Sequence, residues 1–313
     1  MSSMVTITTT MSTKQGTLIV VVGPTGSGKS ALAVRLAQHY HAPIVSTDSR
    51  QLFRNMAIGT AQPTADELAA ATHYFIADRD VDDSFNCGKY EVEALALLSE
   101  LFTKHRYVVA VGGSGLYVQA LCEGMDALPE ADEALRAELK THLKSEGIES
   151  LVEQLCELDP KYAAQVDIHN PARVMRALEV CLMTGRPYSE QRSGRHVERH
   201  FNIIKVATDL PRNVLYERIN RRVDMMVEQG LVDEARALYP KRHLNALQTV
   251  GYREMFDYFD GKSTLDEAIE LIKRNSRRYA KRQLTWFRRD DSTEWYSPDD
   301  FDAIVGHIDS LSR

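Results

Sequence analysis

Short, unbroken apolar runs alternate along the chain with longer segments of helical spacing. One such run covers 18–22, a second covers 107–111, and an apolar-rich run returns at 201–207. Runs of this kind are typical of strands that are buried on both faces, as in a parallel sheet. A shorter run at 42–47 predicts one more strand, and helical periodicity separates these segments. The pattern therefore predicts an α/β core with a central parallel sheet.

A different pattern fills the middle of the chain. Helical periodicity over 132–144, 148–158 and 171–183 is interrupted by Asp-Pro and Asn-Pro boundaries, with no strand between. We therefore expect an inserted all-helical subdomain at 126–200, and a core made of 17–125 and 201–313. The Ser/Thr-rich residues 1–16 are expected to form a disordered tail.

The charge pattern adds a candidate interface. The net charge of -6 over 313 residues excludes a generally basic nucleic-acid binder, so any such role needs a local patch. Lys and Arg recur over 273–289, where Arg274, Arg278 and Arg282 would share one helix face. An acidic chain with one basic stripe is typical of a protein with a polyanionic partner.

The glycine-rich segment 23–30 carries the first chemical motif. It reads Gly-Pro-Thr-Gly-Ser-Gly-Lys-Ser, and it lies between the apolar run at 18–22 and a helical segment that begins at Ala31. Glycines allow the backbone N–H groups to turn toward an oxyanion, and the helix start adds a partial positive charge. Lys29 supplies a cation and Ser30 a hydroxyl for Mg²⁺. The segment predicts a P-loop that binds a di- or triphosphate.

Two further positions follow predicted strands. Asp48 comes after the strand at 42–47, where it is a candidate general base or, with equal weight, a helix N-cap. The strand at 107–111 ends in Gly112-Gly113-Ser114, where a nucleotide hydrolase would carry an Asp for Mg²⁺. The glycines permit close backbone approach to a ligand, and the missing acid weakens an ATPase interpretation.

Together these motifs resemble the tRNA dimethylallyltransferase (isopentenyl-tRNA transferase) family of bacterial type. The resemblance rests on 23–30, Asp48-Ser49-Arg50-Gln51, 56–61, 111–117, 170–180, 250–253 and 281–288, which follow one another in family order. It implies a P-loop NTPase-like fold and transfer of a dimethylallyl group from its diphosphate to N6 of the adenine 3′ of the anticodon. The family usually has Thr where this chain has Ser114, which keeps the hydroxyl and loses a methyl group.

The resemblance also implies a role for individual residues. Catalysis would use Asp48 as general base together with Ser114, Lys29 and Arg222. The diphosphate would bind to Gly23, Pro24, Thr25, Gly26, Ser27, Gly28, Lys29 and Ser30, with Mg²⁺ on Ser30. The tRNA anticodon stem-loop would contact Asp48, Ser49, Arg50, Gln51, Ser114, Arg136, Arg173, Arg176, Gln191, Arg192, Arg195, Arg253, Arg278, Lys281 and Arg282. The helical insertion would grip the anticodon arm.

Three other functions remain open at this point. A small-metabolite kinase would share the P-loop but would not explain the basic stripe. A transferase acting on free adenine nucleotides would share Lys29 and Asp48, and a non-catalytic RNA-binding protein would use Asp48 only as a cap.

The four cysteines form no C-x-x-C pair, which favours free thiols over a disulfide or zinc framework. We expect a cytoplasmic monomer that does not bind membranes.

Overall fold

The computed structural model describes residues 16–126, 128–192, 194 and 197–312, so the expected tail at 1–16 lies almost wholly outside the described residues. The chain forms two compact units. Residues 16–122 and 198–312 make the first unit, and residues 123–197, apart from those not described, make the second. Each is described here by itself.

The first unit is built on a six-stranded sheet in the order β3-β2-β4-β1-β5-β6. The strands are β1 (Thr17–Val22), β2 (Ile44–Ser46), β3 (His73–Tyr74), β4 (Tyr107–Val111), β5 (Asn202–Thr208) and β6 (Thr293–Tyr296). Every neighbouring pair is parallel, and Val20 of β1 is in register with Ala110 of β4 and Lys205 of β5. This confirms the predicted α/β fold with a central parallel sheet. The sequence pattern missed β3 and β6, which are only two and four residues long.

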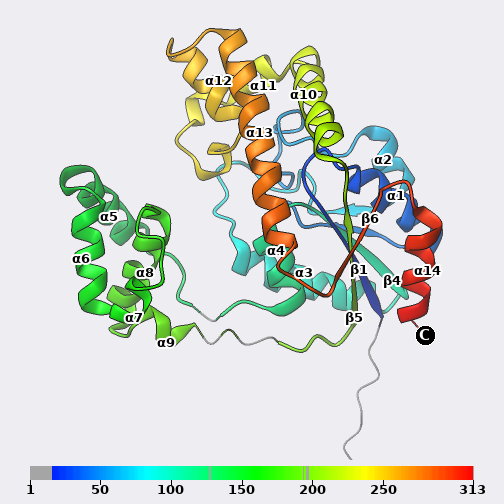
Figure 1. Cartoon of the computed structure of the whole chain (residues 1–313), viewed down its shortest axis with the longest axis horizontal. Helices are drawn as coiled ribbons and strands as arrows, with labels where there is room; N and C mark the ends of the chain where they lie inside the picture. The colour runs from blue at the N-terminus through cyan, green and yellow to red at the C-terminus, as the bar shows by residue number, and fades with distance from the viewer. Residues whose placement is uncertain (1–15, 127, 193, 195–196, 313) are drawn as a thin grey trace, which may run out of the picture. The chain divides into compact units, whose positions relative to one another are not determined.

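Both faces of the sheet are buried, which explains the continuous apolar runs. Ile19 and Val21 of β1 pack on one face with α1 (Lys29–Tyr40) and α14 (Phe301–Leu311). Leu18, Val20 and Val22 point to the other face, where α3 (Cys87–Leu101) and α4 (Gly115–Glu123) contribute to the larger core cluster. Figure 1 shows the sheet between these layers.

Additional helices of the first unit lie beyond the carboxyl ends of the strands. They are α2 (Ala65–Ala70), α10 (Arg212–Glu228), α11 (Leu231–Leu238), α12 (Tyr252–Phe259) and α13 (Leu265–Phe287), with short 3-10 turns at Tyr239–Lys241 and Asn245–Leu247. The 23-residue helix α13 begins at a capping box, in which Thr264 and Glu267 exchange hydrogen bonds. It runs from α12 toward α4 in Figure 1.

The second unit is helical, with α5 (Glu133–Glu146), α6 (Ile148–Leu158), α7 (Pro160–Ala163), α8 (Pro171–Thr184) and α9 (Tyr188–Gln191). Leu139, Leu151, Leu155 and Leu178 form the centre of its core. The carboxylate of Glu179 is buried beside that core, where it pairs with Arg136 at 2.9 Å and Arg176 at 2.8 Å. Two arginines compensate one buried carboxylate, so this ion pair holds α5 against α8.

Two further predictions concern the whole chain. All four cysteines are free thiols; Cys122 and Cys181 are buried and Cys156 is exposed. Among the described residues, the longest apolar helical stretch falls short of what crossing a membrane requires.

Candidate active site

The P-loop lies at the carboxyl end of β1. Gly23, Gly26 and Gly28 have φ values of 147°, 82° and 90°, which favour glycine. A Cβ at residue 23 would lie 2.4 Å from the hydroxyl oxygen of Thr208, so no larger residue fits there. The buried Ser27 hydroxyl donates to the carbonyl of Pro24 and shares a hydrogen bond with Thr208. These hydrogen bonds hold the conformation of the P-loop. The N–H groups of the first turn of α1 have no intrahelical partner and can bind an anion.

Two cations lie on the wall of a cavity next to this loop. Lys29 and Arg222 both line it, together with Thr25 and Ser30. Burial and, to a smaller extent, the positive charge of Arg222 lower the pKa of Lys29 to about 8, although the carboxylate of Asp48 opposes both effects. Burial also lowers the pKa of Arg222. Two cations that burial and mutual repulsion disfavour are typical of a site that is completed by a multiply charged anion.

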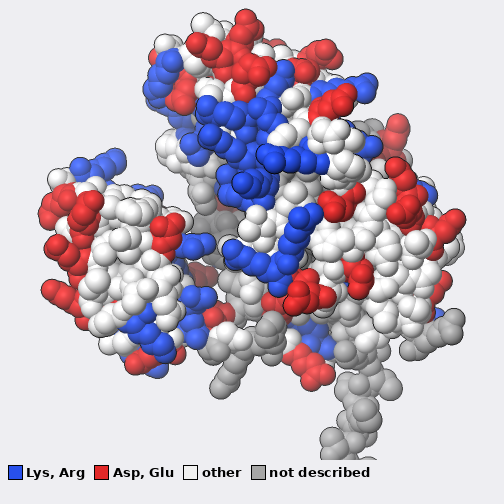
Figure 2. All heavy atoms as spheres, viewed as in Figure 1, with Lys and Arg blue, Asp and Glu red and all other residues white. Residues whose placement is uncertain are grey.

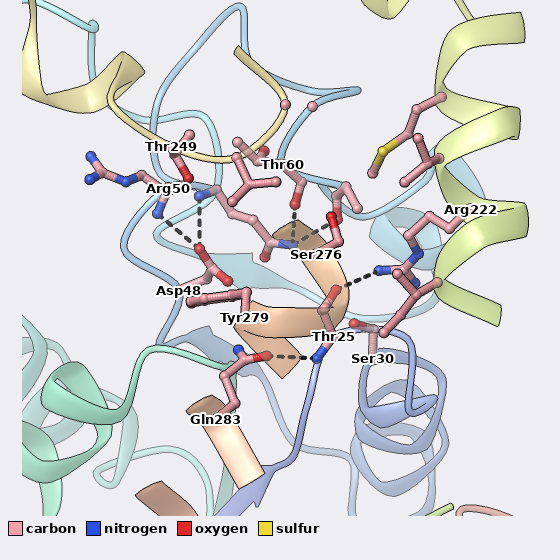
Figure 3. A pocket seen from close by; sticks show the side chains of 18 of the residues that line it. Thr25, Ser30, Asp48, Arg50, Thr60, Arg222, Thr249, Ser276, Tyr279 and Gln283 are labelled. Carbon is pink, nitrogen blue, oxygen red and sulfur yellow. Dashed lines mark hydrogen bonds between the residues drawn. The ribbon is translucent and has the colours of Figure 1, made fainter. Parts of the chain in front are cut away.

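Asp48 faces the same cavity from the end of β2 (Figure 3). Its Oδ1 accepts hydrogen bonds from the N–H groups of Arg50 at 2.9 Å and Gln51 at 3.4 Å. These bonds close a turn and not a helix, so the predicted helix N-cap is wrong in detail, although a local structural role is present. No hydrogen bond from another described residue reaches Oδ2. One carboxylate oxygen therefore holds the turn, and the other is available to a bound molecule.

Helix α13 closes the cavity with polar side chains that the sequence analysis did not assign to the site. Gln283 is 5% exposed; its Oε1 accepts the N–H of Thr25 at 2.8 Å, and its Nε2 donates to the carbonyl of Gly113 at 2.9 Å (Figure 3). A Cβ at residue 113 would lie 2.1 Å from that Nε2. The amide thus joins the P-loop to the Gly-Gly turn after β4, which explains why that turn carries glycine.

Ser114 does not itself line the cavity. Its hydroxyl accepts the N–H of Ser49 at 2.9 Å and donates to the Ser49 hydroxyl at 3.1 Å. Tyr279 lines the cavity, and burial together with the Asp48 carboxylate raises its pKa to about 12. Ser114 therefore orients the turn that carries Asp48, through Ser49.

A metal ion would find few protein ligands here. No cluster of three His, Cys, Asp or Glu side chains with metal-binding geometry occurs among the described residues. The Ser30 hydroxyl lines the cavity and makes no hydrogen bond to another described residue, so it is available as a ligand. This set fits Mg²⁺, which commonly takes one or two protein oxygens and completes its octahedron with phosphate oxygens and water.

The predicted RNA-binding cations of α12 and α13 lie on exposed surface. Arg278, Lys281 and Arg282 are exposed on α13, as is Arg274, and Arg253 is exposed on α12. Figure 2 shows Lys and Arg side chains gathered over α13 in the view of Figure 1. Arg50 is half-buried, and its guanidinium donates to the carbonyl of Asn245 at 2.9 Å.

In the helical unit the predicted RNA-binding residues differ in their surroundings. Arg173 is exposed, whereas Arg136 and Arg176 pair with the buried Glu179. Gln191 donates to Thr184, and the guanidinium of Arg192 lies near the rings of Tyr162 and Tyr188. Arg195 lies outside the described residues. Arg136 and Arg176 thus stabilise the unit, a use that the sequence did not reveal.

The fold and the cavity define a P-loop protein in which Asp48 faces the P-loop across a cavity and the turn after β4 carries Gly-Gly-Ser where a nucleotide hydrolase would carry a metal-binding acid. A family model described as IPP transferase matches residues 51–290. The chain is 47% identical over 298 residues to a tRNA dimethylallyltransferase of Christiangramia forsetii, covering 94% of this chain and 99% of that relative. The chain belongs to the IPP transferase family.

Solved structures agree with this assignment. The structure of a full-length tRNA isopentenylpyrophosphate transferase from Bacillus halodurans is similar, with a TM-score of 0.69, 41% sequence identity and coverage of 94% of this chain and 95% of that one. A eukaryotic dimethylallyltransferase acting on tRNA is similar with a TM-score of 0.76 and 23% identity, over 92% of this chain and 75% of its own. The second likeness supports the fold alone, and both confirm the predicted P-loop NTPase-like core.

Proposed function

We propose that this protein transfers a dimethylallyl group from dimethylallyl diphosphate to N6 of the adenine 3′ of the anticodon in tRNA, with release of diphosphate. The main support for the proposal is the cavity, in which the P-loop, Lys29 and Arg222 face the carboxylate of Asp48. Oδ2 of this carboxylate accepts no hydrogen bond from another described residue. Family membership supports the same reaction, since the curated relatives are named for it.

The phosphate side of the cavity suits a leaving group. As the bond between C1 of the prenyl group and the diphosphate oxygen breaks, negative charge grows on that oxygen. Lys29, Arg222 and the N–H groups of the P-loop would stabilise this charge, and they are held in place before the substrate arrives. Mg²⁺ held by Ser30 and the diphosphate oxygens would supply further charge neutralisation.

The carboxylate side suits the acceptor. The N6 lone pair attacks C1 as the C1–O bond breaks, and the nitrogen must lose one proton to remain neutral. Oδ2 of Asp48 would accept that proton, while Oδ1 stays bonded to the N–H groups of Arg50 and Gln51. Because these bonds fix the carboxylate, the base needs no reorganisation during the reaction.

RNA would be anchored outside the cavity. The exposed cations Arg278, Lys281 and Arg282 on α13 are candidates for phosphate contacts, and Tyr279 and Gln283 of the same helix face the cavity. Extrusion of the target adenine into the cavity would cost a few kcal/mol, which these contacts would offset. We propose that the helical unit grips the anticodon arm through exposed residues such as Arg173, and that one chain acts alone as a cytoplasmic monomer.

Radiolabelled dimethylallyl diphosphate tests the proposal directly. The enzyme is incubated with Mg²⁺ and one of three acceptors: an anticodon stem-loop with adenine 3′ of the anticodon, AMP, or ATP. We expect label only in the stem-loop. Label in AMP or ATP would refute the RNA acceptor, and no label with consumption of ATP would identify a kinase instead.

A further inference from the structure

Glu234 of α11 makes three hydrogen bonds with groups that are distant in the sequence. Its Oε2 accepts the N–H of Ile58 and its Oε1 accepts the N–H of Gly59, both at 2.8 Å. Oε1 also accepts the hydroxyl of Tyr252 at 2.6 Å. Hydrogen bonds to an ionised carboxylate are roughly twice as strong as neutral ones. One side chain therefore fixes the segment 57–61, called here the 57–61 loop.

Tyr252 fixes the same loop by packing. Its side chain is fully buried, and a Cβ at residue 59 would lie 2.6 Å from atoms of its ring, so the ring rests directly on Gly59. Burial raises the pKa of Tyr252, and the neighbouring Glu234 carboxylate raises it further, so the phenol remains a donor. Tyr252 begins α12 immediately after Thr249, Val250 and Gly251, which line the cavity.

The 57–61 loop in turn orients Gln51. Gly59, Thr60 and Ala61 line the cavity with Gln51, and Nε2 of Gln51 donates to the carbonyls of Thr60 at 3.2 Å and Ala61 at 2.7 Å. Both amide hydrogens are thereby used, and the amide cannot flip because Oε1 would then face two carbonyl oxygens. Oε1 is left as the acceptor that Gln51 can offer to a bound amine. In Figure 3, Thr60 lies across the cavity from Thr25 and Ser30.

We propose that Glu234 and Tyr252 are positioning residues that hold the 57–61 loop so that Oε1 of Gln51 accepts one hydrogen of the acceptor's exocyclic amine while Asp48 accepts the other. This inference rests on the proposed function and adds to it how the amine is recognised. A base with a carbonyl at the same position would place one acceptor against another, which disfavours it.

Glu234→Gln tests the inference because it keeps the shape of the side chain. It replaces one carboxylate oxygen by an NH₂ group, which would face the N–H group of Ile58 or Gly59 and could not accept its hydrogen bond. We expect kcat/KM for the stem-loop to fall about tenfold or more, while dimethylallyl diphosphate affinity is unchanged. Hydrogen–deuterium exchange at the amides of Ile58 and Gly59 should accelerate. Asp233→Asn, an exposed neighbour on α11, is the matched control and should leave all three quantities unchanged.

Tyr252→Phe provides a milder second variant, since it removes one hydrogen bond and keeps the ring; we expect a smaller change in the same direction. Unchanged kcat/KM with faster exchange, or only a lower melting temperature, would overturn the inference. So would a loss of kcat/KM with unchanged exchange. A wild-type protein without transferase activity would refute the proposed function instead, and the exchange at Ile58 and Gly59 would still decide whether Glu234 holds the loop.

Discussion

The charge of Lys29 should destabilise the unliganded protein, and Lys29→Met should therefore make it more stable. The pKa of Lys29 falls from its ordinary value of 10.5 to about 8, mainly because burial disfavours the ammonium. At 1.36 kcal/mol per pH unit this difference corresponds to about 3 kcal/mol below pH 8. Because the side chain is only half-buried and the cavity admits solvent, we expect about 1–2 kcal/mol.

The pH dependence fixes the sign of this effect. Below pH 8 the lysine is protonated in both the folded and unfolded states, so the full cost is present. Between pH 8 and 10.5 the folded state loses the proton first, and the stability of the wild type rises toward that of the variant. The advantage of Lys29→Met should therefore be largest near neutral pH and should shrink through this window.

The stability difference can be measured by urea unfolding monitored by tryptophan fluorescence. The two tryptophans, Trp286 and Trp295, lie in the first compact unit of the chain, which also contains Lys29. The free energy of unfolding is compared at about pH 7 and about pH 10 for wild type, Lys29→Met and the exposed-lysine control Lys281→Met. A difference between wild type and Lys29→Met that does not change with pH, or a less stable variant at neutral pH, would refute the reasoning.

Four further outcomes are expected. Asp48→Asn should lower kcat by about 10²–10⁴ and leave RNA affinity nearly unchanged; equal loss of both, seen in a binding assay, would limit Asp48 to holding its turn. Affinity for dimethylallyl diphosphate, measured by calorimetry, should fall as pH rises through 8 in the wild type but not in Lys29→Met, since the anion requires the protonated lysine. Arg278→Ala should weaken tRNA binding and reduce the salt slope by about one; an unchanged slope would remove this residue from the RNA interface. Glu179→Gln should destabilise the helical unit by about 2–4 kcal/mol, lowering the transition followed by circular dichroism without shifting the fluorescence transition.

Local patterns in the sequence were sufficient to predict β1 and the P-loop. The apolar run at 18–22 predicted β1 because a strand buried on both faces has no polar positions. The P-loop was recognisable because its glycines, lysine and serine are consecutive. In contrast, β3 and β6 are too short to carry a pattern of their own, and their pairing with longer neighbours makes them strands.

Asp48 shows where sequence reasoning left alternatives open for a physical reason. A carboxylate after a strand can accept backbone N–H groups or face a ligand, and the same residue type serves both. The structure shows the first role on Oδ1, and no other described residue bonds to Oδ2 of this cavity-lining side chain, so the two interpretations are not exclusive. The turn geometry decides which oxygen of Asp48 accepts the backbone N–H groups, and the sequence alone does not determine that geometry.

Gln283 on helix α13 was not predicted as a residue of the site, although the sequence contains a signal for it. Gln283 contacts the P-loop across 258 residues of sequence, a separation at which no local pattern carries information. A signal was nevertheless present: Ser276 and Gln283 lie on the face opposite Arg274 and Arg278. A helix that exposes its cations must bury the opposite face, and a glutamine there would be costly unless its amide finds partners. Polar residues on the buried face of an amphipathic helix therefore predict a site beneath it, and here that site is the P-loop.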